Sequence, residues 1–152
     1  MHRTAQTGFT LIELVMVIVI IGILAAMAAP RMSLTDSSVH AQAAQIARDI
    51  RHAQMLAMTQ GRTLTFQSLG GSYRCTDSTS TVITDPATQQ PFTFTLNNGV
   101  TLTVASVNFD SLGRPVSGGA LRSTAVDFTV SGGAQSAALS VSPVTGFVAV
   151  MP

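Results

Sequence analysis

Residues 9–29 form an almost uninterrupted apolar run, in which Thr10 and Glu13 are the polar side chains. At about 1.5 Å per residue, a helix of this length spans roughly 30 Å, the thickness of the hydrocarbon core of a bilayer. Arg3 precedes the run and no acidic residue comes before Glu13, so the positive-inside rule places the N-terminus in the cytoplasm. We therefore expect a transmembrane helix over residues 9–29.

The carboxylate of Glu13 lies inside this apolar run, where a charged side chain costs free energy in the membrane. Its presence therefore needs an explanation. A plain membrane anchor accounts for the length of the run but not for the acid. An ordinary signal peptide would be cleaved after a triplet such as residues 26–28, but the run is longer than the roughly 7–15 apolar residues of such signals. Cleavage between Gly8 and Phe9 would instead create an amine four residues before Glu13. In a bundle of parallel helices, Glu13 would then pair with the amine of a neighbour's Phe9.

The segment Gly8-Phe9-Thr10-Leu11-Ile12-Glu13, followed by an apolar helix up to Pro30, resembles the class III signal of type IV prepilins and type II secretion pseudopilins. The resemblance implies that a prepilin peptidase cuts after Gly8 and methylates the amine of Phe9, and that Glu13 acts in assembly. It also implies three further partners: other pilin or pseudopilin subunits, an inner-membrane assembly platform and membrane lipid. Residues 1–8 are then a leader peptide. The mature chain would be a single-pass inner-membrane protein with a periplasmic head, later incorporated into a pilus or pseudopilus.

Residues 30–61 are expected to continue the helix with an amphipathic pattern. We expect Thr35 or Asp36 to cap this part and Gly61 to end it. Apolar residues recur at three- or four-residue spacing, which predicts one buried stripe. The stripe comprises Val39, Ala43, Ile46, Ile50, Ala53 and Ala57. The polar residues Arg48, Asp49, Arg51 and His52 fall largely on other faces.

Residues 62–152 predict a head of mostly antiparallel β structure, because apolar and polar residues alternate in several short runs. Asn98-Gly99 separates the runs 92–96 and 100–104 and indicates a hairpin between them. Residues 75–84, rich in Ser, Thr and Asp, are expected to form a loop. The head is small for a core of its own, so the preceding helix should cover it. The expected fold class is α+β: a long N-terminal helix, transmembrane in its first half and amphipathic in its second, packed on this head.

This arrangement resembles the minor pseudopilin H and FimT group. Residues 107–115, which read VNFDSLGRP, are similar to the F-x-x-x-G-R-P stretch of that group. In structural terms, the stretch predicts a strand that ends in a turn shaped by Gly113 and Pro115. The resemblance implies a minor subunit and does not separate a pilus from a secretion system.

The charges argue against a nucleic-acid partner. All eight basic residues are arginines, and loss of Arg3 with the leader leaves seven against seven acidic residues. Some minor pilins that the head resembles take part in DNA uptake, but the basic residues of this head are scattered along the sequence. They are Arg62, Arg74, Arg114 and Arg122.

No catalytic or cofactor-binding motif is recognisable, so we expect a protein without enzymatic activity and without a cofactor. His40 and His52 each lie near a carboxylate in the sequence, but they are too few for a metal site and indicate a solvated polar face. Cys75 is the only cysteine, which excludes an internal disulfide and favours burial.

The sequence thus predicts a minor pilin or pseudopilin, a structural subunit that assembles into a type IV pilus or type II secretion pseudopilus. Two alternatives stay open. One is a secreted β-rich binding protein whose ordinary signal peptide is removed, so that the mature chain begins near Ala29. The other is a minor pilin that takes up DNA.

Overall fold

The computed structural model describes residues 10–28 and 34–151 of the chain. The chain divides into two compact units, Met1–Met32 and Ser33–Pro152. The first contains helix α1, and the second contains helix α2 and ten β-strands within the described residues. The predicted processing residues Gly8 and Phe9 lie outside the described residues.

Helix α1 runs from Leu11 to Ala28. Its large apolar side chains from Leu11 to Leu24 are 44% to 81% exposed. The predicted membrane span, residues 9–29, includes two residues outside the described part, and the span stays a prediction. Within the described residues, no helix has the length and apolarity that a membrane crossing requires.

Helix α2 runs from Leu34 to Gln60 and places the predicted stripe against the head. All six residues of the stripe are fully buried, as are Ala47 and Leu56 beside it. The predicted cap is wrong, because the helix begins at Leu34 and therefore includes Thr35 and Asp36 in its first turn.

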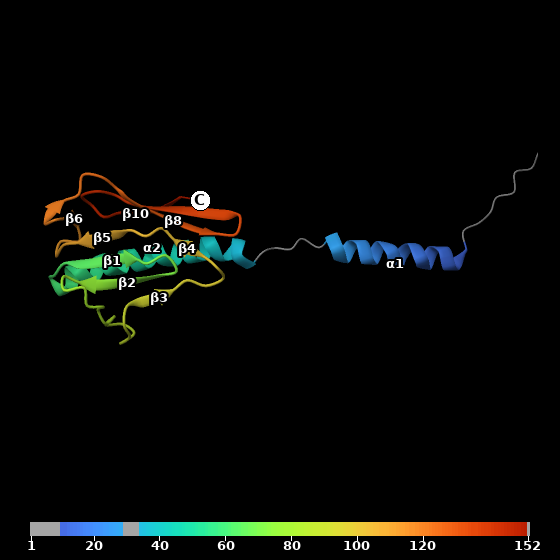
Figure 1. Cartoon of the computed structure of the whole chain (residues 1–152), viewed down its shortest axis with the longest axis horizontal. Helices are drawn as coiled ribbons and strands as arrows, with labels where there is room; N and C mark the ends of the chain where they lie inside the picture. Colours follow the sequence, from blue (N-terminus) through green and yellow to red (C-terminus); the bar gives the residue numbers. More distant parts are fainter. Residues whose placement is uncertain (1–9, 29–33, 152) are drawn as a thin grey trace, which may run out of the picture. The chain divides into compact units, whose positions relative to one another are not determined.

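The strands of the head form two sheets in which every pairing is antiparallel (Figure 1). The strands are β1 (Leu64–Ser68), β2 (Ser72–Asp77), β3 (Thr93–Thr95), β4 (Thr101–Leu102), β5 (Ser106–Phe109), β6 (Pro115–Ser117), β7 (Ala120–Leu121), β8 (Val126–Gly132), β9 (Gln135–Val141) and β10 (Val148–Met151). One sheet has the order β3-β2-β1-β5-β6-β7 and the other has the order β10-β9-β8-β4. The predicted α+β fold with a mostly antiparallel head is confirmed.

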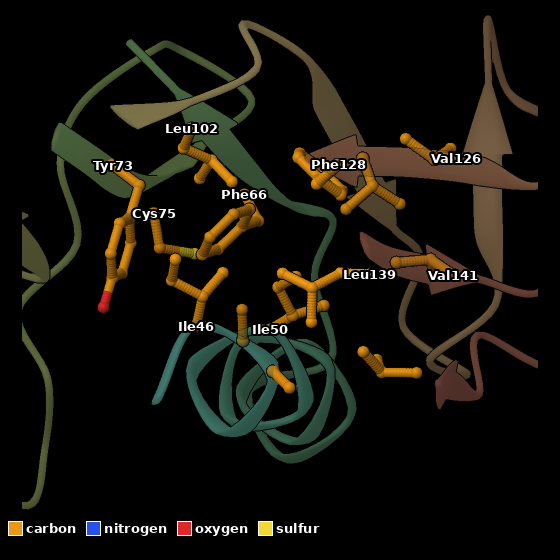
Figure 2. Close-up of a cluster of buried hydrophobic side chains, with 14 of the residues drawn as sticks. Ile46, Ile50, Phe66, Tyr73, Cys75, Leu102, Val126, Phe128, Leu139 and Val141 are labelled. Carbon is orange, nitrogen blue, oxygen red and sulfur yellow. The ribbon is translucent and has the colours of Figure 1, made fainter. Parts of the chain in front are cut away.

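The core of the head lies where α2 meets both sheets. The helix contacts β1 and β5 of the first sheet and β8, β9 and β10 of the second. Figure 2 shows Ile46 and Ile50 of α2 pointing into a cluster of aromatic and aliphatic side chains from the two sheets. Phe66 of β1 and Phe128 of β8 meet edge to face there, with ring centroids 5.8 Å apart. Burial of each such side chain stabilises the folded head by about 1.5–3 kcal/mol. The helix therefore contributes to the stability of the head by supplying apolar area that neither sheet has alone.

The predicted hairpin at Asn98-Gly99 is wrong. The two residues do form a turn, with φ angles of 56° and 69°, and the amide of Val100 donates to the carbonyl of Asn97 across it. However, β3 pairs with β2 and β4 pairs with β8, so this turn carries the chain from one sheet to the other. Leu102 is buried opposite Val130 of β8, and this long-range burial decides the partner of β4.

The predicted loop over residues 75–84 is wrong in its first part, since Cys75, Thr76 and Asp77 belong to strand β2. Tyr73 and Cys75 point into the core and alternate with Arg74, but two apolar residues are too short a pattern to mark a strand. Cys75 pairs with Phe66 of β1 and is fully buried, which confirms the expected burial of the thiol.

Candidate assembly site

The N-terminus of α1 carries the predicted assembly residue. Thr10 occupies the cap position, and its carbonyl accepts hydrogen bonds from the amides of Glu13 and Leu14 at 3.1 and 3.2 Å. The Thr10 hydroxyl accepts a further bond of 3.4 Å from the Glu13 amide. Thr10 and Glu13 have the spacing of a capping box, in which the side chain of the cap residue satisfies an amide of the first turn. These bonds use the backbone amide of Glu13, so its carboxylate is not part of the cap.

The surroundings of the Glu13 carboxylate are apolar. It lies in the first turn of α1 and is exposed, and the helix dipole favours a negative charge at this end. Among the described residues, none donates a hydrogen bond to this carboxylate. Gly22 of α1 has no atom within 4 Å of the position that a Cβ would occupy. Taken by itself, α1 thus presents one acid and an exposed apolar surface.

In the head, residues 109–115 fold as a tight turn between β5 and β6. The carboxylate of Asp110 accepts hydrogen bonds of 2.9 Å from the amides of Leu112 and Arg114. It also forms an ion pair of 2.8 Å with the Arg114 guanidinium. Burial alone would raise the pKa of Asp110, but the bonds from Arg114 hold the pKa below its ordinary value. Gly113 has a φ of 75°, so the expected strand and turn are confirmed.

Gln54 of α2 fastens this turn to the helix. Its side-chain amide donates to the carbonyl of Gly113 at 2.7 Å and to the carbonyl of Thr145 at 3.0 Å. One side chain thereby joins α2 to the β5–β6 turn and to the β9–β10 turn. Sequence reasoning missed this residue, and nothing in the helical pattern distinguishes it from Gln60 at the end of the helix.

A second pair of contacts joins α2 to the segment between β2 and β3. His52 Nε2 lies 3.1 Å from Asp85 Oδ1, and the imidazole stacks on the ring of Phe92 with centroids 5.6 Å apart. Burial would raise the pKa of Asp85, but the Ala87 amide and His52 together lower it. The expected solvated face is thus wrong for His52, because its side chain is 27% exposed and stacks on Phe92, whereas His40 is exposed as expected.

Asp49 of α2 accepts a hydrogen bond of 2.5 Å from the Tyr73 hydroxyl. Burial raises the pKa of Asp49, and the bond from Tyr73 opposes that effect. Burial also raises the pKa of Tyr73, and the neighbouring Asp49 raises it further. Asp49 and His52, two of the polar residues that flank the stripe, therefore bind the head.

Three of the four arginines of the head have side-chain partners within the head. Arg62 lies 3.6 Å from Asp77, Arg114 is paired with Asp110, and Arg74 donates to Gln67. In the part of the chain that the structure describes, no group of three or more His, Cys, Asp or Glu side chains is placed to hold a metal ion.

Comparison with known proteins identifies two matching families. Residues 3–29 match the prokaryotic N-terminal methylation motif, and residues 42–146 match the type II transport protein GspH. The first match covers Gly8, Phe9 and Glu13, the three residues that the sequence assigned to processing and assembly. The resemblances inferred from the sequence are thereby confirmed.

Individual relatives agree with these families. The type IV narrow pilus major component PilA5 of Thermus thermophilus is 50% identical over 56 residues, which are 36% of this chain. The match spans about half, 48%, of the length of that protein. Two crystal structures of the type IV minor pilin FimU from Pseudomonas aeruginosa superpose with TM-scores of 0.56 and 0.55 at 18% identity. They cover 74% and 76% of this chain, and 92% and 90% of the FimU chains. At this identity, the likeness shows a shared fold.

The GspH match alone covers more than half of the chain, and the methylation motif lies where the sequence predicted a prepilin signal. The chain therefore belongs to the GspH family of type II transport proteins and carries the prokaryotic N-terminal methylation motif.

Proposed function

We propose that this chain is a minor pilin or pseudopilin, a non-enzymatic structural subunit of a type IV pilus or type II secretion pseudopilus. The observation that carries the proposal is the combination of Glu13 with the exposed apolar surface of α1. A surface of this kind needs either lipid or other helices around it. Membership of the GspH family and the fold shared with FimU support the same role.

Before assembly, α1 and its flanking residues serve as a single anchor in the inner membrane. Arg3 keeps the N-terminus in the cytoplasm, and the head lies in the periplasm. A prepilin peptidase cleaves after Gly8 and methylates the new amine of Phe9. The match of residues 3–29 to the prokaryotic N-terminal methylation motif supports this processing.

In the filament, Glu13 of one subunit pairs with the amine of Phe9 on a neighbour. A charged residue within a bilayer costs a few kcal/mol, and an opposite charge at hydrogen-bond distance offsets that cost. Phe9 and Glu13 are four residues apart. The pairing would therefore fix the axial offset between parallel helices at a value on the order of one helical turn. The pair thus sets the register, while the apolar side chains supply the contact area.

Two measurements test this function. N-terminal mass spectrometry of the mature protein should find methylated Phe9, whereas a secreted binding protein with an ordinary signal peptide would begin near Ala29. Glu13→Ala and Glu13→Gln should both leave the processed protein in the membrane and remove it from the filament fraction. Unchanged incorporation of either variant would refute the proposed pairing.

The system that the subunit serves is identified by a deletion phenotype. Loss of surface fibres would assign the subunit to a pilus, and periplasmic retention of exported proteins would assign it to a secretion system. DNA uptake is not favoured, because three of the four arginines of the head are bound to neighbouring side chains of the head.

A further inference from the structure

In the part of the chain that the structure describes, the two sheets of the head end in four edge strands, which are β3, β7, β10 and β4. The outer side of an edge strand carries free amides and carbonyls that can pair with a strand of another chain. Lysine side chains on the edge commonly prevent such pairing, but this chain contains no lysine. Residues 92–99, which include β3, carry no charged side chain. The edges are therefore open to strand addition unless other groups close them.

The backbone around β3 points alternately toward β2 and away from it. The Leu96 amide donates to the carbonyl of Gly71 at 2.9 Å, so Leu96 directs its backbone groups toward the neighbouring chain segment. In an antiparallel pair, the residues on either side of such a bonded residue direct their amides and carbonyls to the opposite side. Thr95 and Asn97 therefore direct theirs to the outer edge of the first sheet.

The side chain of Gln42 occupies this outer edge at Asn97. Its Oε1 accepts a hydrogen bond of 3.0 Å from the Asn97 amide, and its Nε2 donates to the Asn97 carbonyl at 3.1 Å. Two paired residues of an antiparallel sheet exchange the same two bonds through their backbones. The side-chain amide of Gln42 thus takes the place that the backbone of an added strand would occupy.

Arg51 closes the β10 edge of the second sheet in a similar way. The Ser142 amide donates to the carbonyl of Phe147 at 2.8 Å, so the next residue, Val148, directs its carbonyl away from β9. The Arg51 guanidinium donates to this carbonyl at 2.8 Å. Gln42 and Arg51 both belong to α2, so one helix caps an edge of each sheet.

The other two edge strands are short. Strands β4 and β7 have two residues each, and a very short edge strand offers few bonds to another chain. At β4, the Leu102 amide also donates to the carbonyl of Gly70 at 2.8 Å, and the Leu102 carbonyl accepts from the Ser68 hydroxyl at 3.3 Å. The caps from α2 therefore lie on the two longer edges. Gln42 holds both backbone groups of its residue, whereas Arg51 holds a carbonyl.

We propose that Gln42 is an autoinhibitory edge cap, which keeps the β3 edge of one head from pairing with the β3 edge of a second copy of this chain. An antiparallel edge is complementary to its own copy across a two-fold axis, so the bonds that Gln42 now makes would otherwise be available to that copy. Residues 92–99 carry no charge that would repel the same segment of the copy. Pairing of this kind would join the sheets of two heads into one. The inference concerns the head alone and does not depend on the proposed function.

Sedimentation equilibrium of the full chain in a density-matched nonionic detergent tests the cap. Gln42→Ala frees the amide and the carbonyl of Asn97, and it should lower the dissociation constant for self-association by about tenfold or more, the effect of two new backbone bonds. Gln60→Ala is the matched control, because Gln60 lies on the same helix and its side chain accepts from the neighbouring Arg62. Association through α1 is common to all variants, so the comparison isolates the head. An unchanged dissociation constant for Gln42→Ala would overturn the proposal.

A second substitution separates pairing of edges from loss of stability. Thr95 faces Ser72 as a non-hydrogen-bonded pair, so Thr95→Pro removes no bond between β3 and β2. Proline on an edge strand blocks the addition of another strand. Gln42→Ala combined with Thr95→Pro should therefore return to the wild-type dissociation constant. Partial unfolding of the head would not be reversed by proline, so continued association of the double variant would show that the freed edge is not the cause and would overturn the proposal.

Discussion

The side-chain amide of Gln54 lies 2.7 Å from the carbonyl oxygen of Gly113 and ties the second half of α2 to the β5–β6 turn. The same amide reaches the carbonyl of Thr145 at 3.0 Å, so two turns from different sheets meet on one side chain. The turn with the F-x-x-x-G-R-P stretch therefore has a packing role. Its glycine approaches the helix closely, and its ion pair between Asp110 and Arg114 holds the turn closed.

Gln54→Ala should destabilise the head by about 1–2 kcal/mol, because two hydrogen bonds worth about 1 kcal/mol each are lost. Urea unfolding of the separated unit, residues 33–152, measures the change as a lower midpoint with the same slope. Gln60→Ala is the control, since the Gln60 side chain accepts a hydrogen bond from the neighbouring Arg62 and does not join α2 to a turn of the head in the part of the chain that the structure describes. Equal midpoints for the two variants would contradict the proposed role of Gln54.

Gly146→Ala should destabilise the head more than Gly118→Ala. Both glycines have a positive φ, 71° and 58°, so both substitutions carry the backbone strain of about 1–2 kcal/mol. A Cβ at Gly118 meets no atom within 4 Å, but one at Gly146 would lie 2.5 Å from Gln54 Nε2 and would displace that amide. The two sites should therefore be coupled.

A double-mutant cycle measures this coupling. In the Gln54→Ala background, the amide that obstructs the new Cβ is gone, and Gly146→Ala should cost less than in the wild type. The Phe109 ring and the Gly113 carbonyl still lie near the site, so part of the cost should persist. Strict additivity of the two substitutions would show that the clash with Gln54 is not the cause.

Asp85→Asn should lower stability at neutral pH, and the difference from the wild type should shrink in acid. The Ala87 amide and His52 lower the pKa of Asp85 below its ordinary value of 3.8, so folding favours the charged carboxylate. A lowered pKa contributes stability above the unfolded value, and this contribution is lost as the pH falls through the folded value. Unfolding midpoints of the wild type and of Asp85→Asn, measured from pH 7 down to about pH 3, test whether the stability difference between them shrinks in acid.

Asp127→Asn is the control for that experiment. Asp127 lies on the exposed face of β8 and accepts a bond from the Ser140 hydroxyl. Asp127→Asn makes the same chemical change without touching the contact between His52 and Asp85. If the stability difference between Asp85→Asn and the wild type grew in acid, folding would not favour the charged form of Asp85.

Local patterns in the sequence were sufficient for the helices and the longer strands. The buried stripe of α2 and the alternation in β1 and β8 each depend on residues close together in the chain. The start of α1 also depends on residues close together in the chain, because Thr10 and Glu13 are three residues apart and belong to one turn. Gly118 and Gly119 mark the β6–β7 turn for the same reason.

Features that depend on distant parts of the chain were not predictable in this way. Gln54 acts on carbonyls 59 and 91 residues away, and His52 meets Asp85 across 33 residues. Asn98-Gly99 determines that the chain turns, but not which strand pairs with β4. That choice depends on the burial of Leu102 against the second sheet, which no local pattern records.

Cys75 should be inert toward thiol reagents in the folded head. Burial raises the pKa of the thiol to about 12, so almost none of it is the reactive thiolate at pH 8. We expect no colour with a disulfide reagent until the head is unfolded in guanidinium chloride, and no disulfide between subunits. Cys75→Ser should cost about 1–3 kcal/mol more than Cys75→Ala, because it buries a hydroxyl without a designed partner. Rapid labelling of the folded head would show that β2 opens at this position, and the thiol could then join subunits after all.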